Sequence, residues 1–202
     1  MSSSGPSVTE ITEEQFRDFA RHHATSPEIG PIATALDSDA KNQKGVDRAL
    51  IGLWGCDKLC AVACFNMYSS AIDKARLVLK LDSIIVAAPL RRRGLAGLLV
   101  AGAFVELLGN GARNIVRIYA HSVHPATVSL LRSLGFRDPQ VVGAPISDLG
   151  IEADNREAFL RLCESQIRDQ MTQMRLQCEF CRKSDKRARP WCSSREDLHK
   201  PR

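Results

Sequence analysis

The spacing of apolar residues changes along the chain from a helical to a strand-like period. In TEEQFRDFARHHA, two phenylalanines and an alanine recur at helical spacing, and Thr12 is a suitable N-cap. Later apolar runs are short and rich in strand-forming residues. The predicted elements are helices at 12–24, 94–108 and 124–136, strands at 49–55, 59–68, 75–87 and 114–123, and one more strand within 136–145.

Two of these elements are predicted to lie deep in the core. Residues 75–87 alternate through three leucines and become continuously apolar from Ile84, so one end of this strand should be more deeply buried. Residues 94–108 are apolar nearly all round and are followed by Gly-Asn-Gly, which predicts a buried helix. The order α, β, β, β, α, β, α, β indicates an α/β fold in which helices flank a mixed sheet.

A long amphipathic helix is predicted from the N-cap Asp154 to about Gln177. Its apolar stripe should pack on the body of the protein or on a second subunit, and the latter would make a homodimer. The stripe consists of Phe159, Cys163, Ile167, Met171 and Met174. The predicted divisions are a disordered N-terminus at 1–8, an α/β domain at 9–150, this helix at 151–177 and a basic, cysteine-containing tail at 178–202.

The net charge of +5 is concentrated at the C-terminal end. Residues 1–174 hold 19 basic and 19 acidic side chains, whereas residues 175–202 hold nine basic and four acidic ones. An acidic partner, nucleic acid included, should therefore bind the tail rather than the neutral body.

The composition is typical of a soluble protein, and we expect a cytoplasmic one without a membrane span. The longest apolar run, residues 95–108, contains Glu106 and is shorter than the roughly 18 residues that a spanning helix needs. No N-terminal stretch has the pattern of a signal peptide. Four cysteines on or beside predicted strands and helices are most simply reduced core residues, namely Cys56, Cys60, Cys64 and Cys163.

The sequence RRRGLAG, residues 91–97, joins a predicted strand to the predicted buried helix. A helix N-terminus exposes unpaired N–H groups and a partial positive charge, and Gly94 has no side chain to block a ligand. Arg91, Arg92 and Arg93 raise the local potential and can donate to phosphate oxygens. This stretch predicts a site for a phosphate-bearing ligand. A Walker-type loop and Gly-x-Gly-x-x-Gly are absent from the sequence, but another nucleotide or a nonspecific nucleic-acid contact remains open.

The same residues resemble the GNAT superfamily of acyl-CoA-dependent N-acetyltransferases. That family's motif, Gln/Arg-x-x-Gly-x-Gly/Ala, follows its fourth strand and opens its third helix, and here it reads Arg91-Arg92-Arg93-Gly94-Leu95-Ala96. The family typically ends its fourth helix in Gly-Phe, as at Gly135-Phe136. The resemblance is specific over residues 77–136 and extends by element order over 9–142. It implies a GNAT-like mixed β-sheet flanked by helices, with acetyl-CoA as cosubstrate.

The resemblance also implies how the cosubstrate binds. The loop amides would hold the pyrophosphate of coenzyme A, and the fourth strand, splayed from its neighbour, would pair with the pantetheine arm and supply an oxyanion donor. The implied cofactor-binding residues are Ile84, Ile85, Val86, Arg91, Arg92, Arg93, Gly94, Leu95, Ala96 and Gly97. Asp82 lies where many members carry an acidic residue and is the predicted catalytic base, although a structural, hydrogen-bonded aspartate is the other interpretation.

The chain departs from the family pattern at the group that protonates the leaving thiolate. Leu131 stands where many members have a tyrosine, and His124 replaces a frequent asparagine. His124 is the first substitute by position, followed by His121, Ser129 and Tyr119, although a histidine at a helix start is more often structural. The alternatives are unassisted departure of the thiolate and a protein that binds acyl-CoA without turning it over.

The tail contains a set of residues that could bind zinc. Cys178, Cys181, Cys192 and His199 could form a Cys₃His site. The other interpretation is a disordered basic tail with free cysteines. A zinc-bound tail would suit a nucleic-acid or acidic-protein contact.

These features predict an N-acetyltransferase that moves an acetyl group from acetyl-CoA to a primary amine in a direct ternary complex. The acceptor could be a small molecule or a macromolecule such as a protein, because residues 16–45, which would select it, show no readable motif. The alternatives are a non-catalytic acyl-CoA-binding sensor or scaffold, and a zinc-dependent adaptor that uses the tail.

Overall fold

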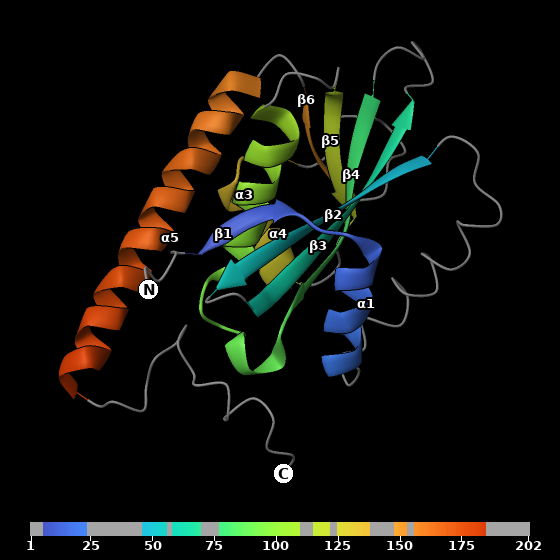
Figure 1. Cartoon of the computed structure of the whole chain (residues 1–202). Helices are drawn as coiled ribbons and strands as arrows, with labels where there is room; N and C mark the ends of the chain where they lie inside the picture. Colours follow the sequence, from blue (N-terminus) through green and yellow to red (C-terminus); the bar gives the residue numbers. More distant parts are fainter. Residues whose placement is uncertain are drawn as a thin grey trace.

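A six-stranded sheet forms the centre of the protein (Figure 1). The computed structural model describes residues 6–23, 46–55, 58–69, 77–109, 115–121, 125–137, 148–152 and 156–184. The strands are β1 (Ser7–Glu10), β2 (Val46–Gly55), β3 (Lys58–Ser69), β4 (Leu77–Val86), β5 (Ile115–His121) and β6 (Asp148–Glu152). They neighbour one another in chain order, and only the β4–β5 pair is parallel. The predicted mixed sheet is confirmed.

Helices cover both faces of this sheet. They are α1 (Glu13–His22), the 3₁₀ turn η1 (Ala88–Leu90), α3 (Leu95–Gly109), α4 (Pro125–Ser133) and α5 (Arg156–Ser184). α1 begins with a capping box in which Thr12 and Gln15 exchange hydrogen bonds, as the predicted N-cap requires. Phe16 and Phe19 of α1 pack on one sheet face, whereas α3, α4 and α5 share the core on the other.

α3 is buried along almost its whole length between the sheet and α5. Phe104 at its centre contacts the rings of Phe65, Phe136 and Phe159, with ring centroids 5.1 to 5.7 Å apart. Such offset and edge-to-face aromatic contacts stabilise a core beyond the area that they bury. Leu95 to Leu108 is therefore apolar on all sides because sheet, α4 and α5 surround it.

The apolar stripe of α5 packs on its own domain. Phe159 and Cys163 are buried, and Ile167 and Met171 pack against the same core. Figure 1 shows α5 lying alongside α3. These contacts account for four of the five predicted stripe residues without a second subunit; the side chain of Met174 lies outside the described part of the chain.

Two boundaries differ from the sequence prediction, and one predicted strand is not described. Ser7 and Val8 belong to β1, so the predicted disordered segment 1–8 ends inside a strand, which was missed because it is short and has a single strongly apolar residue. The predicted strand within 136–145 lies mostly outside the described residues, and a further strand, β6, follows it. α5 continues to Ser184 rather than to Gln177. Among the described helices, none has the length and apolar character to span a membrane.

Candidate active site

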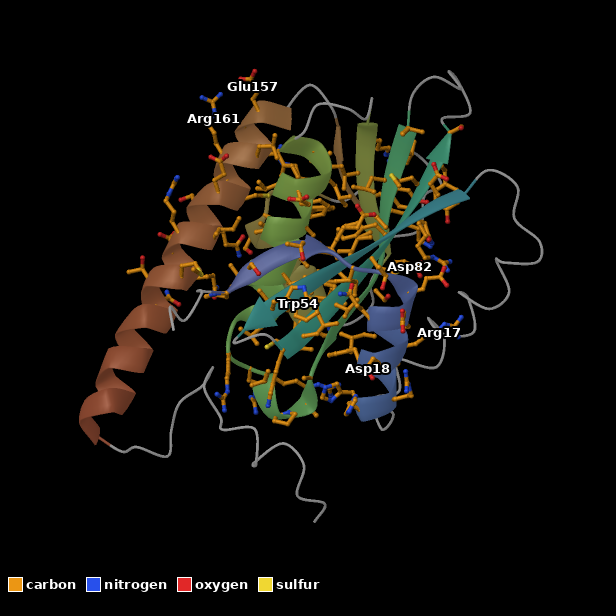
Figure 2. All side chains as sticks on the ribbon, viewed as in Figure 1. Arg17, Asp18, Trp54, Asp82, Glu157 and Arg161 are labelled. Atoms are coloured by element: carbon orange, nitrogen blue, oxygen red, sulfur yellow. The ribbon has the colours of Figure 1, made fainter. Side chains whose placement is uncertain are left out.

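β4 bulges at Asp82, whose side chain is labelled in Figure 2. Ser83 lies opposite Cys64 of β3, and Leu81 lies opposite Phe65, so Asp82 has no counterpart. A bulge of this kind inserts one residue and shifts the alternation of side chains. It explains why Leu81 and Ile84, three positions apart, both pack toward α3. The bulge therefore explains why the alternation of apolar and polar residues in this strand changes at Ile84.

Beyond the bulge, the described pairing of β4 with β5 ends. The parallel pairing ends at Leu81 opposite Ala120, whereas pairing with β3 continues to Val86. Within the described strands, residues 83–86 therefore have a neighbour on one side only. Backbone N–H and C=O groups on such an edge can pair with an extended ligand, as they would with another strand. Ile84, Ile85 and Val86, predicted to bind the cosubstrate, lie on this edge.

The open edge leads through η1 to the loop at the N-terminus of α3. Arg92 and Gly94 have left-handed backbone conformations, with φ of 63° and 78°. The Gly94 carbonyl accepts hydrogen bonds from the N–H groups of Gly97, at 3.0 Å, and Leu98, at 3.2 Å. The N–H groups that open a helix have no partner inside it and carry its positive dipole end. The loop therefore presents backbone donors where the sequence predicted a phosphate site.

The three arginines of the loop are exposed but differ in their contacts. Arg91 Nε donates to the carbonyl of Val86 at 3.1 Å, so this side chain ties the loop to the end of β4. Arg92 and Arg93 belong to the loop immediately before α3 begins. Positive charge here adds to the helix dipole and favours an anion.

The carboxylate of Asp82 is paired with a lysine on the same strand. Lys80 Nζ lies 3.0 Å from Asp82 Oδ1, and about a third of the Asp82 side chain is exposed. Burial acts to lower the pKa of Lys80, but the hydrogen bond and charge of Asp82, aided by Tyr68 and Tyr119, outweigh it and raise this pKa. Lys80 is therefore a cation next to the bulge, and Asp82 can act both as its partner and as a proton acceptor.

A polar row crosses the sheet beside this pair. Arg48 of β2, Asn66 of β3, Lys80 of β4 and Tyr119 of β5 are successive cross-strand neighbours. Arg48 Nε donates to Asn66 Oδ1 at 3.0 Å, which satisfies the amide of a largely buried side chain. These residues alternate with the core residues that face α3, so the row lies on the α1 side of the sheet. The α1 side next to the bulge is therefore polar.

Comparison with solved structures identifies the fold. A structure of AtaTR bound with AcCoA is similar over 76% of this chain and 97% of that chain, with 14% sequence identity and a TM-score of 0.56. A Desulfovibrio desulfuricans protein assigned to the GNAT family of acetyltransferases is similar over 73% and 99%, with 16% identity and a TM-score of 0.52. This chain has the GNAT fold.

A third similar structure, from the KacTA-DNA complex, matches over 77% of this chain and 98% of that chain, with 13% identity and a TM-score of 0.50. Neither the protein-family models nor the curated protein sequences give a match to this chain. The fold that the arginine-glycine motif implied is confirmed by structural similarity.

The candidate acids for the leaving thiolate fall into different environments. Leu131 is fully buried in the core, so this GNAT fold has no side-chain donor where many members have a tyrosine. Tyr119 lies on β5 beside Lys80, and Ser129 is exposed on α4. His121 ends β5, but its side chain and all of His124 lie outside the described residues. Catalytic acid assignments to these residues remain predictions.

The side chains of the four predicted zinc ligands lie outside the described part of the chain. Cys178 and Cys181 lie on α5, which continues through them as a helix, and Cys192 and His199 lie outside the described residues. No group of three or more His, Cys, Asp or Glu side chains suited to a metal occurs among the described residues. Cys60, Cys64 and Cys163 are buried free thiols, as predicted; Cys56 lies outside the described residues.

Two residues next to the loop were missed by the sequence analysis. Gln166 and Gln170 of α5 lie against the first turn of α3. Each follows a residue of the apolar stripe, Cys163 or Ile167, by three positions, so both glutamines lie next to the stripe on the helix surface. Polar residues at the border of a buried stripe were the available signal.

Proposed function

We propose that this GNAT-fold protein transfers an acetyl group from acetyl-CoA to a primary amine in a direct ternary complex. The observation that carries the proposal is the open edge of β4, residues 83–86, leading directly to the backbone donors at the start of α3. An extended pantetheine arm could pair with this edge while its pyrophosphate binds the loop. The similar AtaTR structure, solved bound with AcCoA, supports acetyl-CoA as the cosubstrate.

The backbone and the side chains of the loop would make different contacts with acetyl-CoA. Backbone N–H groups of Gly94, Leu95 and Ala96 would receive the pyrophosphate, since an anion at a helix start is stabilised by unpaired donors and dipole together. Arg92 and Arg93 would add charge-assisted hydrogen bonds. Ternary positioning supplies much of the rate, because it makes the attack effectively intramolecular.

The chemistry takes place beside the bulge. The amine nitrogen forms the amide bond while the carbon–sulfur bond of the thioester breaks. A backbone N–H of residues 84–86 would stabilise the oxyanion. The proton lost by nitrogen passes to Asp82, directly or through water, and the thiolate is protonated by solvent or by His124. The amine would approach from the polar α1 side, where Asp82 and Lys80 lie.

Two measurements on the full chain test this proposal. Calorimetry should detect binding of CoA, and acetyl-CoA thiol release should occur with at least one acceptor among a polyamine, an aminoglycoside, a lysine peptide, a peptide N-terminus and an aminoacyl-tRNA. Binding of CoA with no thiol release would favour a non-catalytic acyl-CoA-binding module. Failure to bind CoA would overturn the proposal.

A further inference from the structure

Two glutamines of α5 lie against residues 91–97, which we call the phosphate-binding loop, at Gly94 and Gly97. A Cβ atom placed on Gly94 would collide with Gln170 Oε1 and would lie 3.2 Å from Gln170 Cδ. A Cβ placed on Gly97 would lie 3.5 Å from Gln166 Nε2 and 3.7 Å from Gln170 Nε2. Side chains at residues 94 and 97 would thus point toward α5, where the two glutamine amides already lie.

The sequence attributed the missing side chain of Gly94 to the approach of a ligand. The structure gives two further reasons. Its φ of 78° is a conformation that residues with a Cβ rarely adopt, and the space for a Cβ is filled by Gln170. A side chain at residue 94 would therefore require Gln170 to move as well as a left-handed backbone.

The two glutamines are polar residues at the edge of an otherwise apolar contact. Both are half-buried on α5, and Gln166 Oε1 is buried with no hydrogen-bond partner in the described part of the chain. A buried polar atom without a partner is unfavourable, and an apolar side chain of similar size would avoid that cost. The two glutamines therefore do not maximise the stability of the contact between α5 and α3, which suggests a role at the neighbouring loop.

We propose that Gln170, with Gln166 beside it, is a positioning residue for the phosphate-binding loop; this inference rests on the proposed function. The loop contains two left-handed residues, Arg92 and Gly94, and such backbone has alternatives of similar energy. The amide of Gln170 fills the space behind Gly94 and limits these alternatives. The loop donors are thereby held in place before acetyl-CoA binds, which lowers the entropic cost of binding.

The first test compares Gln170→Ala with Gln173→Ala, a matched change at an exposed position on the same helix. Gln170→Ala should raise the Kd for CoA about tenfold, or about 1.4 kcal/mol, and raise the KM for acetyl-CoA, with kcat nearly unchanged. Gln173→Ala should leave all three unchanged. Wild-type binding that Gln170→Ala does not alter would overturn this inference alone; a wild type that binds no CoA would overturn the proposed function and this inference with it.

A second variant tests whether residue 170 lies close to the bound phosphates. Gln170→Glu keeps the size of the side chain but adds a negative charge beside the loop, so CoA binding should weaken, and the weakening should shrink as salt screens the charge. Unchanged binding by Gln170→Glu would therefore contradict a role at the loop even if Gln170→Ala proved unstable.

A double-mutant cycle tests the contact itself. Gly94→Ala should lose CoA affinity because of both the collision with Gln170 and the left-handed φ. If Gln170 constrains residue 94, Gly94→Ala already disturbs that contact, so the double variant should lose less CoA affinity than the sum of the two single losses. Additive losses would show that Gln170 does not constrain residue 94 and would overturn the inference.

Discussion

Lys80 Nζ and Asp82 Oδ1 lie 3.0 Å apart on the strand that bulges at Asp82. The pair keeps a carboxylate at the point where β4 leaves β5. A carboxylate there can accept the proton of an attacking amine, and the same carboxylate stabilises a half-buried lysine. The two roles predict different effects of mutation.

Asp82→Asn should lower kcat for acetyl transfer about 100-fold or more, because general-base catalysis typically contributes about 10² to 10⁴. The Kd for CoA should stay unchanged. The loss should be smallest with acceptors whose amine is already neutral at the assay pH. Steady-state thiol release with a series of amines measures this dependence.

Asp47→Asn, at an exposed position on β2, is the matched control and should leave kcat unaltered. If Asp82→Asn retains wild-type kcat with all amines, Asp82 serves only as the partner of Lys80. A uniform loss across amines of different pKa would indicate misfolding of the bulge rather than loss of a base.

A second prediction concerns β1, the strand that the sequence pattern missed. A Cβ on Gly102 of α3 would lie 2.7 Å from Val8 Cγ2 and 2.9 Å from Val8 Cβ. Alanine gains about 1 kcal/mol over glycine in a helix interior, but overpacking costs about 1–3 kcal/mol. Gly102→Ala should therefore be destabilising in urea unfolding, and Val8→Ala, which removes the Cγ atoms but keeps the Cβ, should offset only part of the loss in the double variant.

Gly109→Ala is the control on the same helix, because the neighbouring atom Val105 Cγ1 is 4.0 Å from the added Cβ, an ordinary van der Waals distance. This change should be neutral or slightly stabilising. A stabilising Gly102→Ala would mean that β1 does not press on α3 as the structure indicates.

The fold was largely predictable from the periodicity of the chain, and the missed parts have physical reasons. Three alternating leucines identified β4, but a pattern of apolar residues cannot distinguish a bulge from deeper burial at Ile84. β1 has one strongly apolar residue, Val8, and is held by the close approach of α3 at Gly102. The contact that identifies β1 is therefore a tertiary one, which the local sequence pattern does not contain.

The candidate site was predictable to the same extent. The motif at residues 91–97 identified the loop because glycine and arginines together at the start of a helix favour an anion. Gln166 and Gln170 could not be assigned to it, since only the packing of α5 on α3 brings them to the loop. Their positions beside the apolar stripe indicated that they are partly buried, but not which residues they contact.

Cys163 should be unreactive in the native protein. Burial, with a smaller effect of Glu164, raises the pKa of this thiol to about 12. At pH 8 only about one thiol in ten thousand would then be the reactive thiolate. Native alkylation with iodoacetamide followed by mass spectrometry should find Cys163 unmodified, and unfolding should make it reactive. Rapid native labelling would show that α5 separates readily from the core.

The last prediction links stability to the pH through His23. Burial, then the charges of His22 and Arg91, lower the pKa of His23, whose ring also makes a tilted contact with that of Phe19, with centroids 4.6 Å apart. The unfolded state, with a pKa of about 6.5, therefore binds a proton more readily than the folded state. Stability must then fall as the pH falls from about 7 through this range.

His23→Gln should remove this part of the pH dependence, so the wild type should lose more stability than the variant between pH 7 and pH 5. Urea unfolding at several pH values measures the difference. Because Arg91 lies in the loop that we propose binds the phosphates, an anion bound there should offset its charge and raise the pKa of His23. An NMR titration of the His23 ring with and without CoA should show this increase, and an unchanged pKa would place the phosphates away from Arg91.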